Sequence, residues 1–226
     1  MFLGKGQRLI ICHIGSKDGF VPGGLWVFQS KKTGDYHEEM DGPSFEKWFE
    51  GVLPKLEENA VVVLDNAPYH SRKLEKVPTT ATKKGEIQEW LRSKNLSYEE
   101  AMIKAQLLKI VNENKSQFNL HIIDEMAKAS GRTVLRLPAY HCKLNPIELI
   151  WAKIKGYVAS HNTTFKFADM RKIFEVAVSR ITPENWQKCI EHTNKVENKM
   201  WDLDNIMDVQ VERLVIPLNG SDTSSS

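Results

Sequence analysis

The sequence predicts an α/β fold in which a mixed sheet is flanked by helices and interrupted by a helical insertion. Two strand-like segments, Arg8–Gly15 and Leu25–Gln29, precede an amphipathic helix. The apolar run at 61–64 then leads into Asp65, and a polar, helix-forming stretch at 73–130 separates it from a last short strand, Thr133–Leu137. The order strand, strand, helix, strand is typical of an α/β layer. A chain of 226 residues suits one domain of this kind.

Composition excludes several classes of protein. The chain is 41% hydrophobic and 27% charged, which is ordinary for a soluble globular protein. It has no run of 18 apolar residues and no secretory signal pattern, so we expect neither a membrane span nor an exported protein. The three cysteines are odd in number and lack CxxC spacing, which favours reduced intracellular thiols. A zinc site at His141 and Cys142 would lack a matching second pair of ligands.

The positive charge is concentrated in the middle of the chain. Residues 61–160 hold 16 bases and 10 acids, whereas residues 1–60 hold 7 and 9 and residues 161–226 hold 8 and 10. This distribution suits a polyanion bound near the middle segment, although solvated surfaces also carry such charge.

The first elements follow from local patterns. Glycine and proline between the first two strand segments predict an antiparallel hairpin. Pro43 and Ser44 open a helix that we expect to reach about Glu58, because apolar residues recur there at helical spacing: Phe45, Trp48, Phe49, Val52, Leu53 and Leu56. The next strand ends at Asp65.

The insertion, at about 73–130, contains three predicted helices: Glu86–Ser93, Tyr98–Asn114 and Leu120–Ser130. The first two, IQEWLRSKNL and MIKAQLLKIV, faintly resemble a SAP-type DNA-binding hairpin. The alternative is an amphipathic helical cover on the sheet.

The last third of the chain is predicted to be helical. Asn145 is a good N-cap, Pro146 suits the first helical position, and Glu148 can bond back to the cap. Further helices are predicted at Phe167–Ile181 and Pro183–Trp201, so the helices that follow the last strand occupy about 145–201. We expect one domain over 1–218 and a disordered tail at 219–226. The buried face of the helix after Asn145 is formed by Ile147, Ile150, Trp151, Ile154, Tyr157 and Val158.

Asp65 and Glu148 are the candidate catalytic and metal-binding residues. Cutting a phosphodiester requires an activated nucleophile and a neutralised leaving oxygen, which two Mg²⁺ ions held by carboxylates can supply. Asp65 follows a buried strand, where α/β sheets gather ligands, and Glu148 lies in a first helical turn. Asp65 could instead only start a turn, and Glu148 could be only a capping residue. Four neighbours are candidates for contacting nucleic acid: Asn66, His70, His141 and Lys143.

In combination, VVVLDNAPYHS and LPAYHCKLNPIELIWAKIKGYV resemble the DDE integrase-type catalytic domain of mariner-type transposases. The family's second acid lies in a DNAPxH motif, here Asp65, and its third in LNPIExxW, here Glu148. The resemblance spans about 4–72 and 133–201. It implies an RNase H-like fold, Mg²⁺ or Mn²⁺, cutting and joining of DNA strands in transposition and integration, and a location in the nucleus. With no identifiable helix-turn-helix, we expect DNA binding to be weak and unspecific. A sheet edge left exposed by truncation could pair with a second copy in a homo-oligomer.

Two departures from the family shape the hypothesis. The segment between the two acids is longer than usual, and only MFLGKGQ precedes the first hairpin, where the family has a strand with its first Asp. Asp18, Asp35 and Asp41 fall in predicted loops and do not match that position. We therefore expect a truncated domain that lacks its first strand and is catalytically impaired alone. The alternatives are a non-catalytic DNA- or protein-binding module and an unrelated metal-dependent hydrolase that uses Asp65 and His70.

Overall fold

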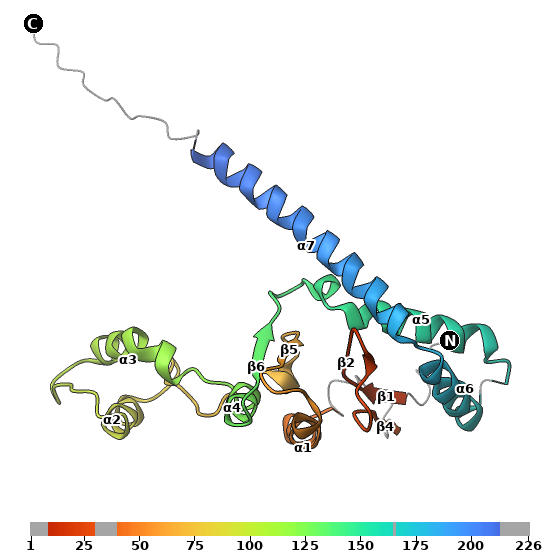
Figure 1. The fold of residues 1–226 in the computed structure, drawn as a ribbon. Coiled ribbons are helices and arrows are strands. Elements are labelled where there is room, and N and C mark those ends of the chain that lie inside the picture. The colour runs from red at the N-terminus through yellow and green to blue at the C-terminus, as the bar shows by residue number, and fades with distance from the viewer. Residues whose placement is uncertain (1–8, 30–39, 165, 213–226) are drawn as a thin grey trace, which may run out of the picture.

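A computed structural model describes residues 9–29, 40–164 and 166–212 (Figure 1). The first strand-like segments form the predicted antiparallel pair, β1 (Leu9–Cys12) and β4 (Trp26–Gln29), with Leu9 opposite Gln29. A small second hairpin, β2 (Gly15–Ser16) with β3 (Gly19–Phe20), lies between them. The predicted tail at 219–226, the segment that precedes β1 and Asp35 lie outside the described residues.

Helix α1 (Gly42–Val52) begins as predicted and ends earlier. The Asp41 side chain caps it by accepting a hydrogen bond from the Ser44 amide at 2.8 Å. The prediction of a helix to Glu58 is wrong, because a 3₁₀ turn, η2 (Leu53–Lys55), follows Val52. Pro54 lies in that turn, and proline has no N–H to continue an α-helical ladder.

Strand β5 (Val61–Leu64) pairs in parallel with β6 (Thr133–Arg136), so that Leu64 lies opposite Arg136. Within the described residues this pair and the β1–β4 pair are separate two-stranded sheets, whereas the sequence predicted one mixed sheet. Packing on α1 joins them instead. Ile10 of β1 and Val62 of β5 are buried in one core with Phe45 and Phe49 of α1, and helix α4 (Ile122–Ala129) completes it.

The antiparallel pair is covered on both faces. Its residues alternate between two cores: Ile10 packs toward α1, whereas Leu9 and Ile11 pack toward α5 (Pro146–His161), α6 (Phe167–Ser179) and α7 (Pro183–Glu212). The predicted buried face of α5 is confirmed. The β5–β6 pair, by contrast, exposes Val61, Val63 and Leu135.

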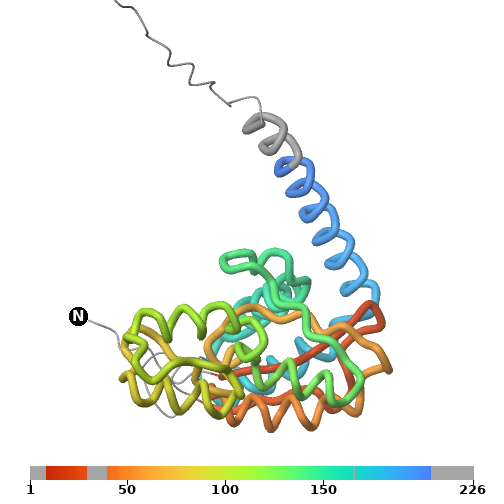
Figure 2. The backbone as a smooth tube through the Cα atoms, turned by 90° about the vertical axis from the view of Figure 1, so that its left-hand side faces the viewer, coloured from red at the N-terminus to blue at the C-terminus, as the bar shows by residue number. Residues whose placement is uncertain are grey.

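Helix α7 is longer than predicted and projects from the body of the molecule (Figures 1 and 2). Its residues Trp201 and Leu203 are exposed. Among the helices that the structure describes, none combines the length and the apolarity needed to cross a bilayer.

The insertion forms a third core beyond α4, at one end of the molecule (Figure 1). Its helices are α2 (Lys84–Ser93) and α3 (Lys104–Phe118), and their buried residues are Ile87, Leu91, Leu107 and Val111. Helix α4, which the sequence predicted within the insertion, packs instead in the core with α1, so the insertion comprises residues 73–121. The prediction that α3 starts near Tyr98 is wrong by six residues. The Tyr98 hydroxyl accepts a hydrogen bond from Arg92, and Glu100 accepts one from Gln88, so the segment before α3 is tied to α2.

Candidate active site

Asp65 lies directly after β5, at the edge of the parallel pair where both strands end. Its Oδ1 atom accepts a hydrogen bond from the Ala67 amide at 3.0 Å, so the turn that the sequence allowed as an alternative is present. The Asn66 side chain donates to the Leu137 carbonyl at 2.5 Å and thereby ties the end of β5 to the end of β6. The Asp65 side chain is 42% exposed, so its carboxylate can still receive a ligand from solvent.

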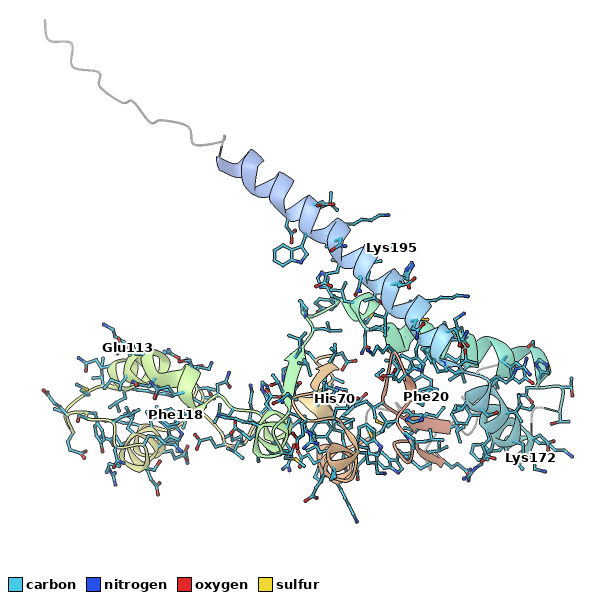
Figure 3. The ribbon with its side chains drawn as sticks, viewed as in Figure 1. Phe20, His70, Glu113, Phe118, Lys172 and Lys195 are labelled. Carbon is cyan, nitrogen blue, oxygen red and sulfur yellow. The ribbon has the colours of Figure 1, made fainter. Side chains whose placement is uncertain are left out.

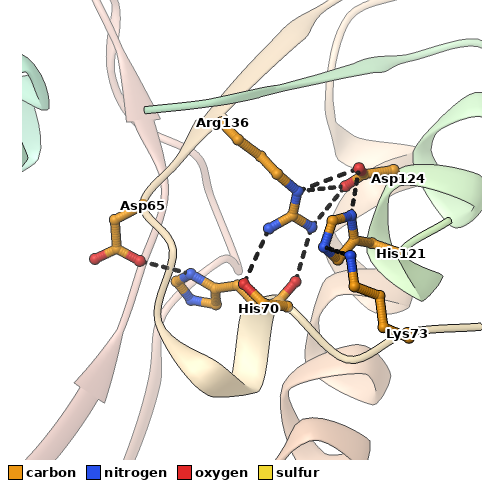
Figure 4. Close-up of polar contacts among 7 residues, drawn as sticks. Asp65, His70, Lys73, His121, Asp124 and Arg136 are labelled. Carbon is orange, nitrogen blue, oxygen red and sulfur yellow. Dashed lines mark hydrogen bonds and ion pairs between the residues drawn. The ribbon is translucent and has the colours of Figure 1, made fainter. Parts of the chain in front are cut away.

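His70 supports Asp65 from inside the protein. It lies in the 3₁₀ turn η3 (Pro68–His70), and its Nδ1 atom is 2.8 Å from Asp65 Oδ1 (Figure 4). The ring N–H is not aligned for a good hydrogen bond, so the contact is a close polar approach. The ring is buried, with its centroid 4.3 Å from that of Phe45. Packing therefore fixes His70 beneath the carboxylate, and its side chain is not on the surface.

Arg136, at the end of β6, anchors the turn that carries His70 (Figure 4). Its Nη2 atom donates to the His70 carbonyl at 2.8 Å and to Asp124 of α4 at 2.6 Å, and its Nε atom is 3.1 Å from both Asp124 carboxylate oxygens. Its Nη1 atom is 3.3 Å from the Ser71 hydroxyl. One guanidinium thus connects the end of β6, helix α4 and the segment 65–71, which is called the Asp65 turn.

The same polar cluster extends to the base of the insertion. His121 Nδ1 lies 3.3 Å from Asp124, and His121 Nε2 lies 2.7 Å from the Lys73 ammonium (Figure 4). Burial, then the charges of Arg136 and Lys73, lower the pKa of His121. Burial and the Arg136 charge likewise lower the pKa of Lys73. The cluster therefore favours a neutral His121 beside its cations.

Glu148 lies exposed in the first turn of α5. The predicted N-cap is confirmed: Asn145 Oδ1 accepts a hydrogen bond from the Ile147 amide at 3.4 Å. The loop before α5 carries His141 and Lys143, two of the four residues predicted to contact nucleic acid. His141 is half-buried, with Nδ1 2.8 Å from the Ala139 carbonyl, and Lys143 is exposed in the 3₁₀ turn η4 (Cys142–Leu144).

Sequence reasoning missed Arg136 and Asp124, the pair that holds the turn next to Asp65. A basic residue inside the short strand TVLRL was the only local signal for Arg136, and its partner lies on another helix. Tyr140 is fully exposed and has a φ of 65°, which is uncommon outside glycine. It projects from the loop between β6 and α5, next to His141.

The candidate metal ligands are the carboxylates of Asp65 and Glu148. Within the ranges that the structure describes, no three side chains of His, Cys, Asp or Glu are grouped so that they could hold a metal ion. Asp65 and Glu148 have carboxylate oxygens of the kind that Mg²⁺ prefers as ligands, and Mg²⁺ often uses only one or two carboxylates and keeps several waters. The cysteines are free thiols, and burial raises the pKa of Cys12 to about 12.

Comparison with models of known protein families gives a match. The family model described as DDE superfamily endonuclease matches residues 25–171, more than half of the chain. This range includes both Asp65 and Glu148. Neither the curated proteins nor the solved structures that were searched gave a match.

Proposed function

Because the chain belongs to the DDE superfamily of endonucleases, we propose that it is a mariner-type transposase domain whose Asp65 and Glu148 bind Mg²⁺ or Mn²⁺. The observation that carries the proposal is the Asp65 carboxylate, half-exposed at the carboxyl edge of β5–β6 and held by a turn, a buried histidine and an arginine. Bound metal would activate water or a DNA 3′-hydroxyl for attack on a phosphodiester.

The protein's own residues have distinct tasks in this proposal. His70 and Arg136 position Asp65, because His70 touches its Oδ1 atom and Arg136 holds the His70 backbone. Such support matters because catalysis is sensitive to shifts of about 1 Å in the reacting groups. The loop residues His141 and Lys143 would meet DNA beside the acids, whereas Asn66 would act mainly by joining the two strand ends.

We propose further that this chain alone cuts DNA poorly. The resemblance calls for three acids on an RNase H-like sheet. Asp65 and Glu148 match two of them, and Asp18, the acid between β1 and β4, lies in a turn and does not match the third. Two carboxylates hold a metal pair less firmly than three, and the reactive geometry would shift.

A plasmid-nicking assay tests both claims. Supercoiled DNA is incubated with the chain and Mg²⁺ or Mn²⁺, with Asp65→Asn and Glu148→Gln as matched variants. We expect nicking close to background in all three proteins, and Mn²⁺ binding measured by calorimetry that is weaker in each variant. Strong nicking that either substitution abolishes would refute impairment while supporting the two acids. Equal Mn²⁺ affinity in all three proteins would refute the metal site itself.

The second candidate is a DNA-binding module that has no cleavage role. The excess of bases over acids in residues 61–160 favours it, since phosphate contacts need only positive charge. DNA binding with no metal dependence, together with unchanged binding in the Asp65 and Glu148 variants, would select it. In either case we propose that the protein acts on DNA in the nucleus and can form a homo-oligomer.

A further inference from the structure

The insertion is built as a unit of its own. The residues Ile87, Leu91, Leu107 and Val111 are completely buried in a core that is separate from the other two. The chain enters and leaves this unit through neighbouring segments, because the Leu74 amide donates to the Leu120 carbonyl at 2.9 Å. The part of the fold that carries Asp65 and Glu148 therefore does not cover the outer surface of the insertion, which is free to bind a ligand.

That surface carries uncompensated positive charge. Residues 73–121 contain nine Lys or Arg and six Glu. This gives the segment a net charge of +3, and one base and one acid neutralise each other where Glu75 pairs with Lys94 at 2.6 Å. Glu86 caps α2 and Glu100 accepts hydrogen bonds from Gln88 and Tyr98, so both carboxylates are fixed on the framework. Five exposed lysines of this segment make no ion pair with any residue in the described ranges: Lys76, Lys83, Lys84, Lys109 and Lys115.

Two of these lysines line a groove of about 730 Å³ between the loop at 78–80 and α3. Its polar lining consists of Thr79, Thr80, Lys109, Asn112, Glu113 and Lys115. The loop is already fixed, because the Lys104 ammonium donates to the Thr80 carbonyl at 2.6 Å and the Thr79 amide donates to the Thr82 hydroxyl at 2.9 Å. The groove therefore offers two ammonium groups, two hydroxyls and an amide on a framework that needs little ordering.

We propose that this groove binds the sugar–phosphate backbone of duplex DNA. Lys109 and Lys115 would neutralise phosphates, while Thr79, Thr80 and Asn112 would donate hydrogen bonds to phosphate oxygens. The choice of DNA as the polyanion rests on the proposed function. Glu113 is the acid among the lining residues, and its carboxylate would repel a DNA phosphate. Removing its charge should therefore strengthen binding.

The test is binding of the full chain to a fluorescent 25-base-pair duplex of arbitrary sequence, followed by anisotropy over a range of salt. EDTA is present, so the result does not depend on metal at Asp65 or Glu148. The double variant Lys109→Gln/Lys115→Gln is compared with Lys172→Gln/Lys195→Gln, which removes the same charge from exposed sites on α6 and α7 (Figure 3). Circular dichroism checks that every variant is folded.

We expect the groove variant to bind about tenfold or more weakly, with a salt slope less steep by about 1.8, since each phosphate contact contributes about 0.9. The control pair should change little, and Glu113→Gln should bind a few-fold more tightly. Equal losses in both double variants would overturn the groove, because net charge alone would then explain binding. Binding to duplex RNA without binding to DNA would also overturn it. The nicking and Mn²⁺ results, which this assay does not use, decide the proposed function separately.

Discussion

Replacing Arg136 by glutamine should lower the free energy of unfolding. It should also make the position of the Asp65 carboxylate less fixed. The guanidinium makes a two-nitrogen contact with Asp124 at 2.6–3.1 Å and a 2.8 Å hydrogen bond to the His70 carbonyl, and it is only 15% exposed. Truncating one partner of a partly buried charged pair costs about 2–3 kcal/mol, because the remaining carboxylate and carbonyl lose their donors. Asp124 is 33% exposed, so water recovers part of this loss and we expect about 2 kcal/mol.

Urea unfolding measures the loss, and a double-mutant cycle with Asp124→Asn isolates the pair. We expect a coupling energy of about 1–2 kcal/mol between the two positions, since they share one hydrogen-bonded network. Arg136→Lys is the matched control: it keeps the charge but cannot make the forked contact, so it should recover less than half of the stability. Loss of less than about 0.5 kcal/mol in Arg136→Gln, with unchanged Mn²⁺ affinity, would refute the view that this residue anchors the Asp65 turn.

Three further predictions concern stability. A Cβ at Gly15 would lie 2.2 Å from the buried Trp186 ring, so Gly15→Ala should lower the unfolding free energy by about 1–3 kcal/mol in urea titrations. Burial lowers the pKa of His13 from 6.5 to about 4, and its ring stacks on Phe20 at 4.0 Å. The neutral ring is favoured in the folded state, so the unfolding free energy falls by roughly 1–2 kcal/mol, after screening, as the pH drops from about 6.5 to 4. In urea titrations at several pH values, His13→Gln should remove this loss. Tyr140→Gly should raise the melting temperature slightly, because glycine adopts its φ of 65° without strain; a lower value would contradict this.

Local patterns predicted the elements that local interactions determine. The apolar run before Asp65 became β5, and the Asn145–Pro146 pair became the start of α5. Their signals, β-branched residues and an N-cap, act within a few residues of the chain. The end of α1 was misjudged because apolar spacing continues past Pro54 while the α-helical ladder does not.

Contacts between distant segments could not be predicted in this way. Arg136 meets Asp124 and His70 only because β6 pairs with β5 and α4 packs beside them. The segment before α3 is tied to α2 by side-chain hydrogen bonds, and in the part of the chain that the structure describes the β1–β4 and β5–β6 pairs meet through packing on α1 and not as one sheet. The candidate acids were therefore identifiable from their motifs, whereas the residues that hold one of them in place were not.

The described residues form three separate cores, which explains how a long insertion can stand between the two candidate acids. The insertion's helices α2 and α3 bury their apolar residues against each other, so they do not need to pack on a strand pair. Its two ends meet where Lys73 and His121 touch, and His121 in turn contacts Asp124, the partner of Arg136. The Asp65 turn is thus held directly by Arg136 of β6 and Asp124 of α4, while α2 and α3 connect to this network through Lys73 and His121, at the ends of the insertion.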